Sequence, residues 1–85
     1  MLRIKVHPRI NEKRPDISDE DVIVAWINHL IIRRRYVEEL SQLRVIGIDG
    51  KGRFLQMVAA EKEDGILLIY HAMKLTNRFA KELDL

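Results

Sequence analysis

Three apolar segments joined by two short turns make up most of the second half of this 85-residue chain. The segments are residues 42–49, 53–61 and 66–73, and the turns are residues 50–52 and 62–65. Strands joined by such short glycine-containing turns lie next to each other and run antiparallel, so the pattern predicts a three-stranded meander. Residues 3–7 alternate weakly and end at Pro8, which predicts a short fourth strand.

Two helices are expected around this meander. Ser18 is a favourable N-cap, and three acids follow it in the first turn of a helix that we expect to run to Ile32. Thr76 caps a short helix over residues 77–83. Residues 36–41 fit a helix extension, a short strand or a loop. The sequence therefore predicts an α+β fold, in which one main N-terminal helix packs on an antiparallel three- to four-stranded sheet and a short helix follows.

Length and composition limit the number of domains and the kinds of site. Residues 1–85 are expected to form a single domain, because a chain this short has no room for two cores. The absence of cysteine excludes disulfides, thiolate metal sites and a cysteine nucleophile. The three histidines lack metal-ligand spacing, so we expect no metal and no cofactor. The longest apolar run, residues 22–32, is too short to span a membrane, and we expect a cytoplasmic protein.

The expected main helix is apolar on more than one side. Ile23, Ile27 and Ile31 recur at intervals of four residues, beside Val22 and Trp26. A helix with this much apolar surface is buried on several sides, and in so small a domain one of these sides is available to a partner. We therefore expect the three isoleucines to form a partner interface, either with another protein or in a homodimer.

Basic residues are concentrated in two segments, although the formal net charge of the chain is only +2. The first segment, residues 1–14, ends with Lys13 and Arg14, and the second is the run Arg33, Arg34 and Arg35. Two such patches are suited to the phosphates of RNA. The alternative interpretation is that these side chains are solvated surface residues.

Three cations and one phenol follow the turns of the meander: Arg53, Tyr70, Lys74 and Arg78. If Asp49 pairs with Arg53 across the first turn and Glu63 pairs with Ile66 across the second, then Arg53, Tyr70 and Lys74 share one face of the sheet. Cations in such a position stabilise the charge that develops on a phosphoryl group without the help of a metal, so Arg53 and Lys74 are candidate catalytic residues. Arg78 is a candidate RNA-binding residue. The competing interpretation is that Arg53 forms an ion pair with Asp49 and that the other cations are solvated.

His71 is the histidine nearest to this strand end, and we consider it a candidate general acid or base. Alternation along the strand places its side chain on the opposite face from Lys74. Only a twist or a bulge near Met73 would bring both side chains to one site.

The order of several short motifs resembles that of the BrnT-type toxins of bacterial type II toxin–antitoxin systems. The matching segments are residues 45–49 (VIGID), 52–55 (GRFL) and 68–76 (LIYHAMKLT), with a looser match at Lys13-Arg14 and residues 17–21. Lys13, Arg53, Lys74 and Thr76 coincide with positions of the family motifs. Met73 stands where the family has an arginine, His71 where it has a serine, and Arg14 where it has a histidine.

This resemblance implies a RelE-like fold and a metal-independent ribonuclease. It also implies an antitoxin partner, which usually carries a ribbon-helix-helix DNA-binding part. The alternative that we keep beside it is a non-catalytic binding module of the same fold, for protein or for RNA.

Overall fold

The computed structural model of the protein describes residues 3–37, 40–62 and 64–84. The elements in chain order are β1 (Arg3–Val6), α1 (Arg9–Lys13), α2 (Asp19–Ile27), β2 (His29–Val37), β3 (Leu40–Ile48), β4 (Phe54–Glu61), β5 (Ile66–Lys74) and α3 (Asn77–Glu82). Within these described ranges, no helix is long and apolar enough to cross a membrane.

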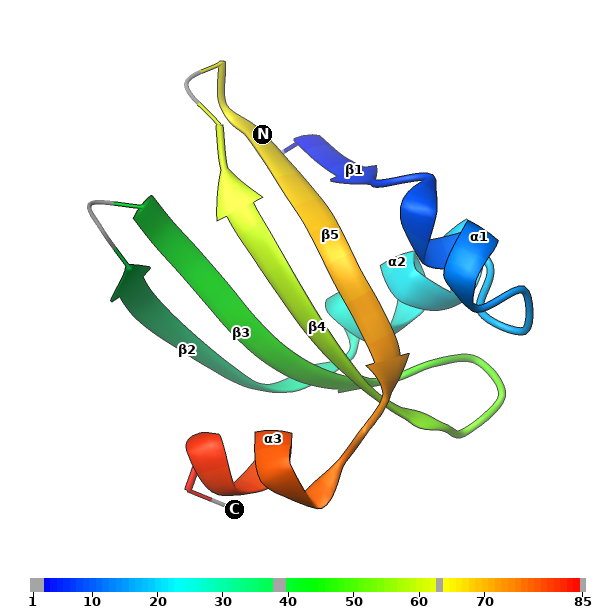
Figure 1. Ribbon diagram of the computed structural model, residues 1–85. Coiled ribbons are helices and arrows are strands. Elements are labelled where there is room, and N and C mark those ends of the chain that lie inside the picture. Colours follow the sequence, from blue (N-terminus) through cyan, green and yellow to red (C-terminus); the bar gives the residue numbers. More distant parts are fainter. Residues whose placement is uncertain (1–2, 38–39, 63, 85) are drawn as a thin grey trace.

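The five strands form one mixed sheet in the order β1-β5-β4-β3-β2 (Figure 1). Strands β2 to β5 are paired antiparallel, whereas β1 runs parallel to β5, with Arg3 opposite Ile66 and Val6 opposite Ile69. The expected antiparallel three- to four-stranded sheet with one main N-terminal helix is therefore wrong, and the RelE-like fold that took this form is wrong with it. The parallel pair joins segments more than sixty residues apart, so no local turn signal reveals it.

The helix that was expected to reach Ile32 ends at Ile27, and the residues after it form β2 instead. Asn28 closes the helix as its C-cap. Ile31 and Ile32 then pack against different apolar clusters, because neighbouring side chains of a strand point to opposite faces. A strand that buries both of its faces is as continuously apolar in sequence as a buried helix, which explains the error.

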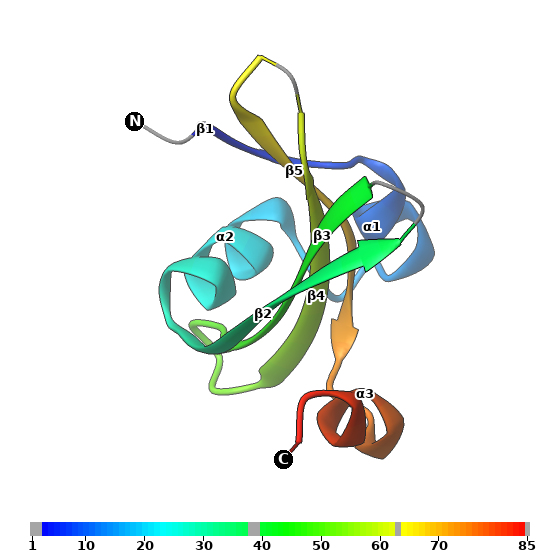
Figure 2. The same cartoon turned by 90° about the vertical axis from the view of Figure 1, so that its left-hand side faces the viewer.

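Helix α2 covers one face of the sheet, which we call the covered face (Figure 2). Ser18 begins the helix as expected, in a capping box in which Asp21 N–H donates to Ser18 Oγ and Ser18 N–H donates to the Asp21 carboxylate. The core on this face includes Val22, Ala25 and Trp26 of the helix and Val45, Leu55, Met57 and Ile69 of the sheet. A Cβ atom added to Gly47 would lie 1.8 Å from the Ala25 carbonyl oxygen, so the backbones of α2 and β3 touch directly.

Helix α3 packs against one end of the opposite face, where Phe79 and Leu83 contact Ile46 and Val58 (Figure 1). Thr76 caps this helix as expected, because its hydroxyl accepts a hydrogen bond from the Phe79 N–H. We call this the open face, since the larger helix lies on the other side of the sheet.

The predicted pairing of Asp49 with Arg53 is confirmed by a 3.0 Å hydrogen bond between their backbones. The β4–β5 pair contains one irregularity, because Val58 lies opposite His71 but the next residue of β4 lies opposite Ile69. The extra residue is Tyr70. The sequence had predicted its side chain on the face of Arg53, but the side chain packs on the open face against the apolar cluster of Ile46, Val58, Phe79 and Leu83, which we call the open-face cluster. Glu63, the predicted partner of Ile66, lies outside the described residues.

Candidate nucleic-acid interface

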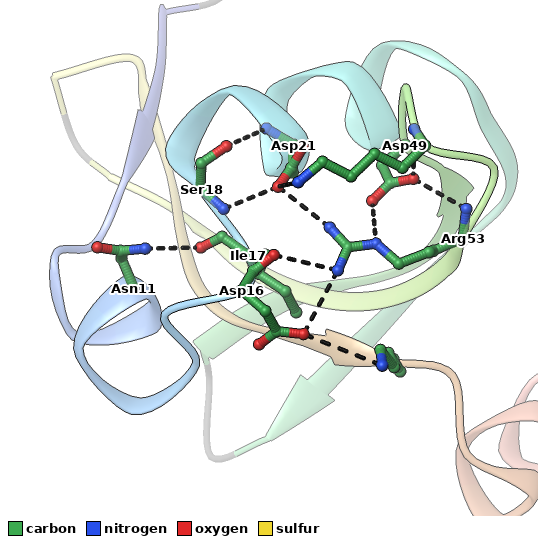
Figure 3. Close-up of polar contacts among 9 residues, drawn as sticks. Asn11, Asp16, Ile17, Ser18, Asp21, Asp49 and Arg53 are labelled. Atoms are coloured by element: carbon green, nitrogen blue, oxygen red, sulfur yellow. Dashed lines mark hydrogen bonds and ion pairs between the residues drawn. The ribbon is translucent and has the colours of Figure 1, made fainter.

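Arg53 lies on the covered face, at the centre of a group of carboxylates (Figure 3). Its Nε donates to Asp49 at 2.7 Å, and its Nη2 donates to Asp21 at 3.1 Å. Its Nη1 donates to the backbone carbonyl oxygen of Asp16 at 3.1 Å. These bonds tie the β3–β4 turn to the loop before α2. We call the group the Arg53 cluster, and its members are Asp16, Asp21, Asp49, Lys51, Arg53 and Lys74.

The charges of the Arg53 cluster balance, with three cations and three carboxylates. Lys51 Nζ lies 3.4 Å from Asp21, and Lys74 Nζ lies 4.0 Å from an Asp16 carboxylate oxygen. Burial alone would raise the pKa of Asp49, whose side chain is fully buried, but hydrogen bonds from Arg53 and the Lys51 backbone outweigh burial and lower it. The structure thus places Arg53 and Lys74 on one face, as expected, but Arg53 is paired with carboxylates of the protein, and the largely exposed Lys74 lies beside Asp16.

A groove of about 500 Å³ crosses the open face between α1 and α3. Its floor is formed by side chains of β3, β4 and β5, and its cations come from three different elements: Arg9, Lys13, Arg44 and Arg78. Glu82 is the one acid among its lining residues, and this carboxylate is already paired with Arg44. The groove is therefore strongly basic, in contrast to the neutral Arg53 cluster.

A chain of hydrogen bonds at the groove fixes the imidazole of His71. The backbone N–H and the hydroxyl of Thr76 both donate to Gln56 Oε1, at 2.8 and 2.9 Å. The amide nitrogen of Gln56 is thereby directed at His71 Nε2, 3.2 Å away. Because that amide nitrogen is a donor, His71 Nε2 accepts, and the proton of the neutral imidazole lies on Nδ1.

The electrostatic surroundings of His71 favour the same neutral form. Burial lowers its pKa, and the positive charges of Arg14, Lys13 and Arg44 lower it further. The neighbouring Tyr70 keeps its phenol proton, because burial raises its pKa more than Arg44 lowers it. At neutral pH both side chains therefore present hydrogen-bond donors beside the cations.

The predicted RNA-binding residues Lys13, Arg14 and Arg78 all lie at this face. Lys13 and Arg78 line the groove, and Arg14 lines a smaller adjoining hollow, where its guanidinium donates to Met73 Sδ at 3.3 Å. His71 lines both hollows. The structure therefore separates His71 from Arg53 and Lys74, which occupy the other face. The irregularity at Tyr70 leaves this separation in place, because it lies before His71 and not near Met73.

The arginine run of β2 divides between the two faces. Arg34 turns to the covered face and forms an ion pair with Glu61 at 2.6 Å. By alternation Arg33 and Arg35 point to the open face. The hollow beside them is lined by all three arginines of the run together with Arg44, Glu82, Leu83 and Asp84, so it shares Arg44 with the main groove but also contains two acids. The two basic segments of the sequence thus meet on one surface.

Several polar residues that line the groove were not among the residues predicted from the sequence to form a site. They are Arg9, Gln42, Arg44 and Gln56. Gln42 and Arg44 alternate with Ile46 along β3, so extending the predicted pairing of β3 with β4 would have placed them on the face of His71. Arg9 belongs to the basic segment of residues 1–14, although it was not singled out there.

The three isoleucines of the predicted partner interface do not form one stripe. Ile23 and Ile27 are exposed on α2, whereas Ile31 belongs to β2 and packs against the open-face cluster. Leu30, also exposed, follows them in sequence. Association through Ile23 and Ile27, with a partner protein or a second copy, stays a prediction.

Among the described residues, no group of three or more histidine, aspartate or glutamate side chains is arranged to hold a metal ion. The carboxylates that converge in the Arg53 cluster surround a guanidinium instead. Comparison of the chain with protein-family models, with curated proteins and with solved structures finds no match. The resemblance to BrnT-type toxins therefore stays a prediction from the sequence.

Proposed function

We propose that the protein binds single-stranded RNA across the open face, with the cations of the groove on the phosphates. The observation that carries the proposal is the imbalance of charge in the groove, where four cations face one acid. The whole chain has a net charge of only +2, so the excess positive charge is concentrated on this surface. Concentrated cations attract a polyanion and gain affinity by releasing its counterions.

The shape of the open face favours a single strand over a duplex. An open basic groove with an aromatic side chain is the usual platform for unpaired nucleotides, because the cations follow the backbone and the ring stacks on a base. Tyr70 supplies such a ring beside the cations. Helix α3 is only six residues long and packs on the sheet, so it is poorly suited to enter the groove of a duplex.

The proposal is tested by titrating the protein into a labelled, unstructured RNA while the anisotropy is measured at several salt concentrations. We expect the affinity to fall steeply between about 50 and 200 mM salt. The part of the affinity that comes from phosphate contacts should depend little on the base sequence. Arg78→Ala should weaken binding and lower the slope against log salt by about 0.7, the value for one contact to a single strand. Lys81→Ala is the matched control, because Lys81 lies on the same helix but is not among the residues that line the groove. Binding that is absent or insensitive to salt would contradict the proposal.

A second candidate function is metal-independent cleavage of RNA on the same face, which the neutral, half-buried His71 favours. The hydrogen bond from Gln56 occupies the Nε2 lone pair, so His71 acts more readily as a donor to a phosphate than as a base. For this reason we rank binding above cleavage. Incubation of labelled RNA with the protein and a chelator decides between them: cleavage that His71→Gln abolishes would favour the ribonuclease.

The ribonuclease candidate includes the toxin role implied by the resemblance, with an antitoxin protein as the partner. Under that role, expression of the protein in a bacterium arrests growth and degrades RNA. Normal growth together with stable RNA would contradict the ribonuclease and favour the non-catalytic binding module. Both candidates include a cytoplasmic location, where RNA is abundant.

A further inference from the structure

Two buried polar atoms on strand β3 lack a partner. Among the residues that the structure describes, neither Gln42 Oε1 nor Arg44 Nε has a hydrogen-bond partner, and both atoms are buried. The two residues are separated by one position, so their side chains lie next to each other on the open face. Both residues line the groove.

Unpaired buried atoms of this kind are rare, because a buried donor or acceptor loses its bonds to water without a replacement. The nearby Gln56 shows the usual situation, since Thr76 and His71 satisfy its oxygen and its nitrogen. Arg44 cannot easily turn its Nε elsewhere. Its guanidinium is paired with Glu82 and lies 5.8 Å from the centre of the Phe79 ring.

Both atoms are covered in this structure, so a ligand reaches them only when the two side chains turn toward the groove, and it must then offer complementary groups. Arg44 Nε is a donor and needs an acceptor, whereas Gln42 Oε1 is an acceptor and needs a donor. A phosphate offers acceptors only and leaves Gln42 unsatisfied. The edge of an unpaired nucleobase carries a donor beside an acceptor, so it satisfies both atoms at once.

We propose that Gln42 and Arg44 bind the edge of an unpaired nucleobase, so that the open face recognises bases as well as phosphates. This inference rests on the proposed RNA-binding function and adds a base pocket to it. Tyr70 lines the same groove, where the irregularity of β5 has turned it to the open face, and it provides a ring on which that base stacks. The surrounding cations hold the phosphates on either side.

The test compares RNA homopolymers with an abasic RNA of the same length and charge, measured by anisotropy at one salt concentration. The abasic strand keeps every phosphate and every 2′-hydroxyl but lacks the base edges. We expect at least one homopolymer to bind the parent protein roughly tenfold more tightly than the abasic strand does. In Gln42→Leu that ratio should fall severalfold, while stacking on Tyr70 keeps it above one.

Equal affinity of the parent for every homopolymer, whether or not the abasic strand binds as tightly, would overturn the base pocket while the phosphate-binding function stands, because stacking on Tyr70 alone does not distinguish the bases. Failure to bind any of the strands would overturn both. The comparison on the parent protein decides the question even if the variant is poorly folded. We expect Gln42→Leu to fold at least as stably as the parent, since leucine replaces an unpaired buried oxygen with an apolar group of similar size.

Discussion

Both faces of the sheet carry cations, but the number of carboxylates beside these cations differs between the faces. On the covered face, three cations meet three carboxylates in the Arg53 cluster. On the open face, four cations line a groove that contains one acid. A cation in a sequence therefore indicates little about function until the fold shows which carboxylates it meets. The first group stabilises the fold, and the second is available to a polyanion.

The covered face should be the less tolerant of change, and Gly47→Ala gives the largest expected effect. The added Cβ would lie 1.8 Å from the Ala25 carbonyl oxygen, so α2 must move away from β3. We expect the free energy of unfolding in urea to fall by about 3 kcal/mol. Gly50→Ala is the control, because a Cβ there has no atom within 4 Å. If both variants unfold like the parent, α2 does not rest on β3 in this way.

Within the Arg53 cluster, buried and exposed carboxylates should differ. Asp49→Ala removes a fully buried side chain that accepts from Arg53 and from two backbone N–H groups, and we expect a loss of about 2–3 kcal/mol in unfolding free energy. Asp16→Ala removes a carboxylate that is 58% exposed and should cost less than about 1 kcal/mol. Equal losses in urea denaturation would mean that burial does not distinguish these partners.

The sequence predicted the first hairpin better than it predicted the second hairpin or the sites. The turn at residues 50–52 is local, and the pairing of Asp49 with Arg53 follows from it. The acids that neutralise Arg53 and Lys74 are less accessible to such reasoning. Asp16 and Asp21 lie more than thirty residues before Arg53, and only the packing of α2 brings them to the turn.

The same limit applies to the open face. Lys13, Arg14, Arg78 and His71 were identified as separate candidates, yet their convergence depends on α1 and α3 lying at opposite ends of one groove. Arg44 was missed because it stands alone in an apolar strand, and only extension of the predicted strand pairing would have placed it on the face of His71.

Removal of a single cation should weaken RNA binding when the cation lies on the open face, but not when it lies on the covered face. We expect Lys13→Ala to weaken the affinity for RNA about fivefold, since Lys13 lines the groove and would contact a phosphate. Lys51→Ala removes the same charge from the Arg53 cluster and should leave the affinity unchanged. An anisotropy titration of both variants checks this, and a larger loss in Lys51→Ala would reverse the proposed roles of the two faces.

Acid should destabilise the two faces in different pH ranges, which is the smallest of these effects. The pKa of His71 is lowered in the folded state by burial and by Arg14, Lys13 and Arg44, so the unfolded chain binds its proton first. The stability that it contributes is complete above the ordinary value of 6.5 and is lost as the pH falls through its folded pKa.

The pKa values of Asp21 and Asp49 are also lowered, Asp21 chiefly by the hydrogen bond from the Ser18 backbone, so their contribution is lost only as the pH falls below 3.8. Urea denaturation from about pH 7 to about pH 3 should therefore show two separate declines. We expect His71→Gln to remove the first and to keep the second. A first decline that persists in this variant would show that another group causes it.

The most direct test of the account is to map the RNA contact on the protein by NMR. A ¹⁵N-labelled sample is titrated with a single-stranded RNA on the order of ten nucleotides long. We expect the amide signals of Gln42, Arg44, His71 and Arg78 to shift, while those of Lys51 and Arg53 stay in place. The largest shifts at Lys51, Arg53 and Lys74, or no shifts at all, would contradict the claim that the open face is the binding surface.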